Sequence, residues 1–151
     1  MSALLSIKNL SIRFNDAERE FTAVDAVSID VHQNRMVAIV GESGSGKSLT
    51  ALSILHLLPK AARVVGEMHF EKEPGLILPL HSLAKKDWLQ IRGRKIAMIF
   101  QEPMTSLNPV FTCGFQVAEV LRQHLKLDAA SVRERVIQLF ERVELREPSA
   151  I

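Results

Sequence analysis

The first third of the chain carries the apolar pattern of β-strands. Residues 4–14 and 21–31 are rich in branched apolar side chains in partial alternation, and the polar segment 15–20 separates them. This pattern predicts two strands that pair in an antiparallel element. Residues 64–70 predict a further short strand, and the proline- and glycine-containing segment that follows predicts a loop with at most a brief strand.

Two apolar runs, "MVAIV" at residues 36–40 and "KIAMIF" at residues 95–100, lack this alternation. Each is bounded by turn residues. Continuous runs of this kind are typical of strands buried on both faces, as in a parallel sheet. We therefore expect both to be buried strands of an α/β domain.

Four segments predict helices. Residues 48–58 are apolar on nearly every side and stop at Pro59, which indicates a buried helix ended by proline. Residues 87–93 predict one or two helical turns. Residues 114–126 predict an amphipathic helix, and a second begins near Asp128, a candidate N-cap. We expect these two helices to pack on each other through their apolar faces, and we assign no function to their charged faces.

Composition excludes several classes of function. The 19 basic and 17 acidic residues are interspersed and give a net charge of +2, whereas a nucleic-acid-binding protein would need a concentrated basic face. The single Cys113 cannot form an internal disulfide, which favours a reduced, intracellular protein. The five histidines show no metal-ligand spacing. We expect neither a signal peptide nor a membrane-spanning helix, since no apolar stretch approaches about 20 residues.

The segment "GESGSGKS" stands between two of the most apolar parts of the chain. Gly41, Gly46, Lys47 and Ser48 satisfy G-x-x-x-x-G-K-[ST], the P-loop or Walker A pattern. Glycine lets the backbone N–H groups approach a phosphate closely, and the following helix points its free N–H groups at the same anion. A flexible glycine–serine linker is the alternative, but it predicts polar flanks. The predicted nucleotide-binding residues of this segment are Gly41, Glu42, Ser43, Gly44, Ser45, Gly46, Lys47, Ser48 and Leu49.

A longer match narrows the class. "GESGSGKS" followed by "IAMIFQEPMTSLNPVFTCGFQVAEVL" resembles the ATP-binding subunit of ABC transporters, above all those that import oligopeptides, dipeptides and nickel. The resemblance spans nearly the whole chain, and "FQEPMTSLNP" is its most specific part. It implies a P-loop NTPase (RecA-like) α/β core with an N-terminal antiparallel β element and the start of an α-helical subdomain. The implied division is an incomplete ATP-binding core at residues 1–101 and a truncated helical subdomain at 102–151.

The resemblance also assigns roles to single residues. Gln101 matches the Q-loop glutamine, which contacts Mg²⁺ and the attacking water. Lys47 and Gln101 are thus the implied catalytic residues, and Ser48 and Gln101 the implied ligands of the metal in Mg-ATP. Phe14 aligns with the aromatic residue that stacks on adenine; the alternative is that Phe14 ends a strand and packs in the core.

The implied partners are integral-membrane permease subunits, a second ATP-binding subunit and, indirectly, a solute-binding protein, at the cytoplasmic face of the cell membrane. One departure from the family pattern is Asn34–Arg35, where Gly-Glu is usual. Asparagine tolerates positive φ, so we expect the turn to survive. The implied importer has no nucleic-acid partner.

The chain contains neither the "LSGGQ" signature nor the Walker B strand nor the switch histidine. Most of the phosphoryl-transfer machinery is therefore absent, and we expect these 151 residues alone to be inactive. Two alternatives stay open. One is a truncated, non-catalytic nucleotide-binding fragment. The other is a P-loop kinase of small molecules, whose lid arginines could be only Arg92 and Arg94.

Overall fold

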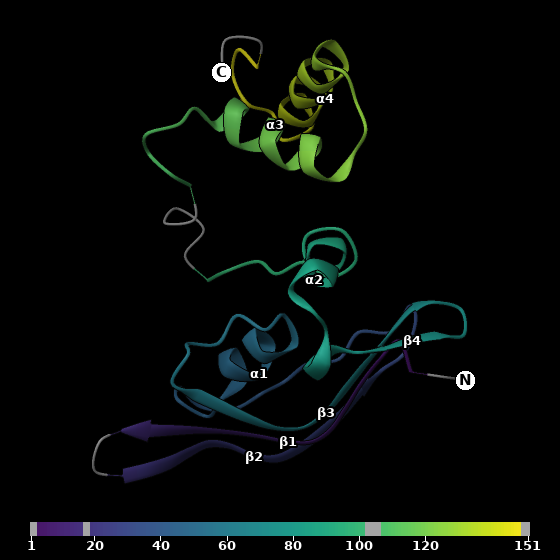
Figure 1. Ribbon diagram of the computed structural model, residues 1–151. Helices are drawn as coiled ribbons and strands as arrows, with labels where there is room; N and C mark the ends of the chain where they lie inside the picture. Colours follow the sequence, from purple (N-terminus) through teal and green to yellow (C-terminus); the bar gives the residue numbers. More distant parts are fainter. Residues whose placement is uncertain (1–2, 17–18, 102–106, 149–151) are drawn as a thin grey trace. The chain divides into compact units, whose positions relative to one another are not determined.

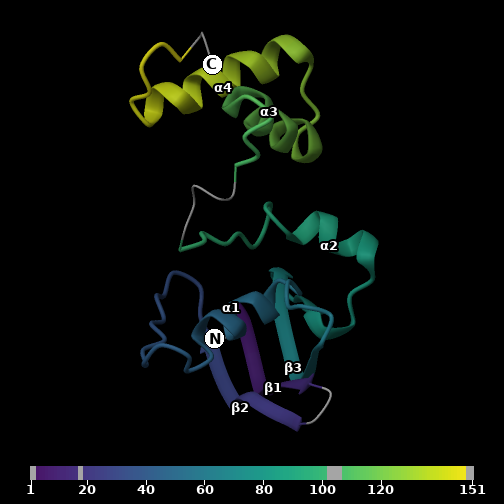
Figure 2. The same cartoon turned by 90° about the vertical axis from the view of Figure 1, so that its left-hand side faces the viewer.

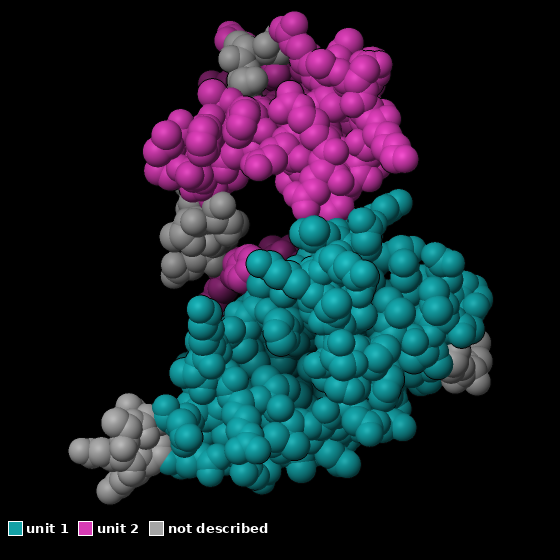
Figure 3. Space-filling view, viewed as in Figure 1, with its two compact units in different colours: residues 1–96 teal, residues 97–151 magenta. Residues whose placement is uncertain are grey.

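The structure, a computed structural model, describes residues 3–16, 19–101 and 107–148. They form two compact units, residues 1–96 and 97–151, each described by itself below (Figure 3). The functional boundary after Gln101 stays a prediction. The elements in chain order are β1 (Leu5–Asp16), β2 (Arg19–Val31), α1 (Lys47–Ile54), β3 (Ala62–Glu73), β4 (Leu76–Pro79), the 3-10 turn η1 (Leu80–Ser82), α2 (Lys85–Ile91), α3 (Cys113–His124) and α4 (Ala129–Arg142).

The first unit is built on an antiparallel sheet with the strand order β2-β1-β3-β4 (Figure 1). β1 pairs along its length with β2, which confirms the predicted antiparallel element; Ile12 faces Val24 across this pair. β3 is longer than predicted because it pairs with β1 along most of its length, and β4 is the brief strand expected after it. The turn at Asn34 has φ 58°, as the asparagine there predicted.

One face of this sheet carries the core. Trp88 and Ile91 of α2 are buried in a single cluster with strand residues. The strand and turn members of the cluster are Ile7, Leu10, Ile12, Val24, Met68, Phe70 and Leu80. Figures 1 and 2 show α1 lying over the sheet. Leu49 and Ile54 of α1 pack against the same cluster, so the helix is held to the sheet by one face only.

Helix α1 differs from the prediction in length and in character. It ends at Ile54, four residues before the predicted end, because His56 takes up a left-handed conformation at φ 52°. Its most buried side chains are polar: Thr50 Oγ1 donates to the Gly46 carbonyl at 3.0 Å, and Ser53 Oγ donates to the Thr50 carbonyl at 2.7 Å.

The two predicted buried strands are wrong for this structure. Residues 36–40 belong to an irregular loop (Figure 2), and residues 97–100 carry no strand either. Met36 is 95% exposed and Ile99 92% exposed. A strand forms only when a neighbour accepts its ladder hydrogen bonds, and within the described ranges no neighbouring strand pairs with either run. The sequence pattern shows that both segments are apolar, but it does not show whether a neighbouring strand is present to pair with them.

The second unit contains the two predicted amphipathic helices. Ala118 of α3 packs with three residues of α4, namely Val132, Val136 and Phe140. The Asp128 side chain accepts a hydrogen bond from the Ser131 N–H at 2.8 Å, which confirms the predicted N-cap. This hydrogen bond lowers the pKa of the Asp128 carboxyl below its usual value. In the described ranges, no helix has the length and apolar character needed to cross a bilayer.

The exposed apolar runs generate a prediction about the 151-residue chain as a purified polypeptide. Exposed apolar surface drives association, so we expect oligomers and a broad thermal transition. Met36→Ser combined with Ile99→Ser should reduce self-association in sedimentation velocity and leave the melting temperature unchanged. Lys126→Ser, an exposed polar exchange, should change neither. A monodisperse wild-type chain with a sharp cooperative melt would contradict this expectation.

Candidate phosphate-binding loop

The glycine-rich segment leads directly into the amino end of α1. A turn closes between the Ser45 N–H and the Glu42 carbonyl at 3.3 Å, and the helix starts at Lys47. Gly46 is the residue that precedes the helix, with φ 87°, a left-handed value that favours glycine. The loop is therefore curved back on itself at a helix amino end, as the phosphate-binding pattern predicted.

Gly46 also brings the loop into close contact with strand β2 of the sheet. A Cβ at this position would lie 2.7 Å from Val24 Cγ2 and 2.8 Å from the Ala23 carbonyl oxygen, both on β2. Val24 belongs to the core and Ala23 O is backbone, so neither can withdraw. Close packing thus requires glycine here independently of its φ value.

The Lys47 ammonium group lies over the loop. Its Nζ donates to the Gly41 carbonyl at 2.8 Å, to the Glu42 carbonyl at 2.5 Å and to Ser45 Oγ at 3.3 Å. All three of these acceptors are neutral oxygens. An anionic ligand at the loop would give the ammonium group a stronger, charge-assisted acceptor.

The first turn of α1 supplies further donors. The N–H groups of the first helical residues have no acceptor within the helix, and the helix dipole places partial positive charge at that end. Leu49 packs its side chain against the core cluster, which leaves its backbone N–H as the group available to a ligand. Ser43 and Gly44 are exposed at the open side of the loop. Amides, dipole and ammonium group together suit a phosphate.

The same loop fits a magnesium nucleotide. Ser48 lies in the first turn of α1 and is exposed, so its hydroxyl is accessible as a metal ligand. The described part of the chain holds no group of three or more His, Cys, Asp or Glu side chains arranged for a metal. Mg²⁺ commonly takes few protein ligands and completes its shell with phosphates and water, which matches a site with a single hydroxyl.

Phe14 combines features of both interpretations that the sequence left open. Its ring stacks on Phe21 across the β1–β2 pair, with 6.4 Å between centroids and 23° between planes, and it packs beside the core cluster. Phe21 is 60% exposed. Stacking on adenine stays a prediction for Phe14. Sequence reasoning missed Phe21, which an antiparallel alignment of the two predicted strands could have found.

Gln101 is exposed at the end of a described range and belongs to the second unit. Lys47 and Ser48 belong to the first unit, so the role of Gln101 at the metal stays a prediction. Arg92 has a clear local partner: it donates to carbonyls at the carboxyl end of α1. Because Arg92 is bound to these carbonyls, it is a poor candidate for the phosphate-binding lid arginine that the kinase alternative requires.

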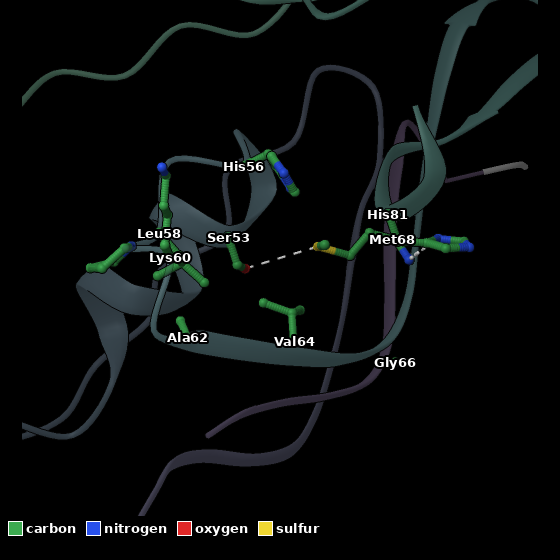
Figure 4. Close-up of a pocket in the computed structure, with 10 residues that line it drawn as sticks. Ser53, His56, Leu58, Lys60, Ala62, Val64, Gly66, Met68 and His81 are labelled. Atoms are coloured by element: carbon green, nitrogen blue, oxygen red, sulfur yellow. Dashed lines mark hydrogen bonds between the residues drawn. The ribbon is translucent and has the colours of Figure 1, made fainter. Parts of the chain in front are cut away.

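A separate pocket of about 360 Å³ lies between the carboxyl end of α1 and β3 (Figure 4). Ser53 and Met68 meet across its floor, where Ser53 Oγ lies 3.9 Å from Met68 Sδ. Its polar rim residues, His56, Lys60 and His81, are exposed. The pocket is at the opposite end of α1 from the phosphate loop and is no part of the predicted site.

The first unit combines an antiparallel sheet, a helix packed on it and, at the amino end of that helix, a glycine-rich loop with the P-loop sequence pattern. Comparison with known proteins agrees: the family model described as "ABC transporter" matches residues 24–150. The chain therefore belongs to the ABC transporter family. This match confirms the predicted fold class. The exception is the pair of buried strands predicted at residues 36–40 and 95–100, which the structure does not contain.

The relatives are ATP-binding proteins of peptide transport. The chain is 42% identical to the dipeptide transport ATP-binding protein DppD of Haemophilus influenzae, covering 98% of this chain and 44% of that protein. It is 41% identical to the oligopeptide transport ATP-binding protein AppD of Bacillus subtilis, covering 95% of this chain and 43% of the relative. The chain thus spans less than half the length of these relatives.

Solved structures show the same fold. The dimeric bacterial ABC transporter cassette MJ0796 matches with a TM-score of 0.76 and 25% identity, over 95% of this chain and 58% of that chain. A post-hydrolysis state of MJ0796 bound to ADP and Pi matches with a TM-score of 0.74 and 23% identity, over the same shares.

The packing of Gly46 generates a prediction. Gly46→Ala should destabilise the first unit, because the added methyl group meets Val24 and the Ala23 carbonyl in a left-handed conformation that alone costs about 1–2 kcal/mol. Gly75→Ala is the matched control, since Gly75 has φ 82° but open space around it. Chemical denaturation should show a clearly larger loss for Gly46→Ala. Equal losses in the two variants would refute the close-packing argument.

Proposed function

We propose that this chain forms the nucleotide-binding part of an ATP-binding subunit that energises the import of peptides or related solutes. The observation that carries the proposal is the convergence of the Lys47 ammonium group and the amino end of α1 on one loop. Membership of the ABC transporter family and the peptide-transport relatives support the solute class.

Different residues of the loop bind different parts of Mg-ATP. Backbone N–H groups from Gly44 to Leu49 hydrogen-bond the phosphate oxygens, and Lys47 exchanges its carbonyl acceptors for the β- and γ-phosphates. Ser48 supplies a hydroxyl to Mg²⁺, which neutralises charge that develops on the phosphates when bound. Phe14, with Phe21 beside it, offers an aromatic face to adenine.

Hydrolysis needs more than this loop. Gln101 is the proposed contact to Mg²⁺ and to the attacking water, whereas the catalytic carboxylate of the family comes from a Walker B strand that these 151 residues do not contain. In the proposed importer, a second ATP-binding subunit completes each site, and the pair acts on permease subunits at the cytoplasmic face of the membrane. A solute-binding protein delivers the solute to the permease.

The alternative is a non-catalytic fragment that binds nucleotide without turning it over. The 151 residues contain the P-loop pattern but neither the signature motif nor the Walker B strand. The structure gives less support to a small-molecule kinase, because Arg92 is bound to α1.

Removing the ammonium group tests nucleotide binding. A charge-assisted contact contributes about 1.5–3 kcal/mol, so Lys47→Ala should weaken ATP affinity by about 10- to 150-fold. Lys60→Ala is the matched control, because Lys60 lies exposed beyond the other end of α1. Isothermal titration calorimetry with Mg²⁺ measures both. Unchanged affinity in Lys47→Ala would remove Lys47 from the site.

Phosphate release separates the two candidate functions. The 151-residue chain should bind ATP but release no phosphate above background, since it lacks the catalytic carboxylate. The full reading frame, if it continues through the missing motifs, should release phosphate in a Lys47-dependent manner. Steady-state turnover by the 151 residues alone would contradict the assignment of catalysis to the missing part.

A further inference from the structure

The carboxyl end of α1 is closed by a turn that normally uses glycine. The Leu57 N–H donates to the Leu52 carbonyl at 2.9 Å and the His56 N–H donates to the Ser53 carbonyl at 3.0 Å, the paired bonds of a Schellman motif. Its left-handed position is occupied by His56, at φ 52°. A side chain there is disfavoured, so this turn persists only if its surroundings hold it.

Arg92 provides that support. Its Nε donates to the Leu55 carbonyl at 2.8 Å, and its Nη2 donates to the His56 carbonyl at 2.9 Å. These two carbonyls lie at the end of α1, where the helix dipole is negative, so a cation there is favourable. One planar side chain thereby satisfies two adjacent backbone acceptors.

Trp88 fixes Arg92 in turn. The guanidinium carbon lies 4.8 Å from the centroid of the Trp88 ring, within the range of a cation–π contact. The His56 ring also stacks on Trp88, with 5.9 Å between centroids and 20° between planes. Trp88 is only 5% exposed and is part of the core cluster. The end of α1 is thus clamped to α2, and through α2 to the sheet.

The phosphate loop lies at the opposite end of the same short helix. α1 has eight residues, about 12 Å of helix, and it packs on the sheet by one face only. Gly46 fixes its amino end against β2, and Arg92 fixes its carboxyl end against α2. In a helix this short, a rotation of the carboxyl end also reorients the backbone N–H donors at the amino end.

We propose that Arg92 is a positioning residue for nucleotide binding. By holding the Leu55 and His56 carbonyls against Trp88, it keeps the N–H groups at the amino end of α1 aimed at the phosphate. The inference rests on the proposed function, since it concerns the affinity of that same loop. Nucleotide binding at the loop should therefore also change the environment of Trp88 at the far end of α1.

Arginine and lysine should differ at this position. Lysine carries a point charge that can reach one carbonyl, but it lacks the planar fork that serves two acceptors while lying on an indole ring. The behaviour of the Arg92→Lys variant therefore separates a requirement for charge from a requirement for geometry. Arg94 offers a matched control, because it lies two residues further along and hydrogen-bonds Gln90 Oε1 of α2 at 3.2 Å.

The experiment compares wild type, Arg92→Ala, Arg92→Lys, Arg94→Ala and Lys47→Ala. ATP affinity is measured by calorimetry with Mg²⁺, below the melting temperature of every variant, and circular dichroism confirms that each is folded. Trp88 is the only tryptophan of the 151 residues, so its emission reports on the clamp directly.

We expect Arg92→Ala to weaken ATP affinity about tenfold and Arg92→Lys to lie closer to Arg92→Ala than to wild type, with Arg94→Ala within about twofold of wild type. ATP should change Trp88 emission in wild type and Arg94→Ala but not in Arg92→Ala. Wild-type affinity in folded Arg92→Ala, or in Arg92→Lys if the alanine variant does not fold, would overturn the inference while leaving the proposed function intact. Absence of ATP binding by the wild type, or unchanged affinity in Lys47→Ala, would overturn both.

Discussion

The contact between Gly46 and β2 is the constraint on which the rest of the site depends. Only a residue without a side chain can lie against Val24 and the Ala23 carbonyl, and the left-handed φ of Gly46 turns the chain from loop into helix at that point. The loop is thereby fastened to the core of the antiparallel sheet. Lys47 then lies over the loop carbonyls because it is the first residue of α1.

Helix α1 acts as a strut between two fixed ends. Its fully buried side chains are the polar Thr50 and Ser53, each of which bonds to backbone within the helix or at its start, whereas the apolar Leu49 and Ile54 are only partly buried against the core cluster. The ends compensate for this: Gly46 packs on β2, and Arg92 joins the carboxyl end to Trp88. These contacts hold both ends of a short helix in place.

Features with local causes could be predicted from the sequence. The phosphate loop, the first strand pair, the positive φ of Asn34 and the Asp128 N-cap all follow from neighbouring residues. Features that need a distant partner could not. The runs at 36–40 and 97–100 have the composition of strands but no strand to pair with in the described chain. Arg92 hydrogen-bonds the carbonyls of Leu55 and His56, which precede it in the sequence by 37 and 36 positions. No periodic pattern of residues predicts a contact over such a separation.

Backbone amide chemical shifts on addition of Mg-ADP show where the phosphates bind without any mutation. We expect the largest ¹H–¹⁵N changes at Gly44, Gly46, Lys47 and Ser48, with the downfield amide proton shifts typical of hydrogen bonds to phosphate. Changes concentrated around the pocket at His56 and Lys60, or no change in the loop at saturating nucleotide, would contradict phosphate binding at this loop.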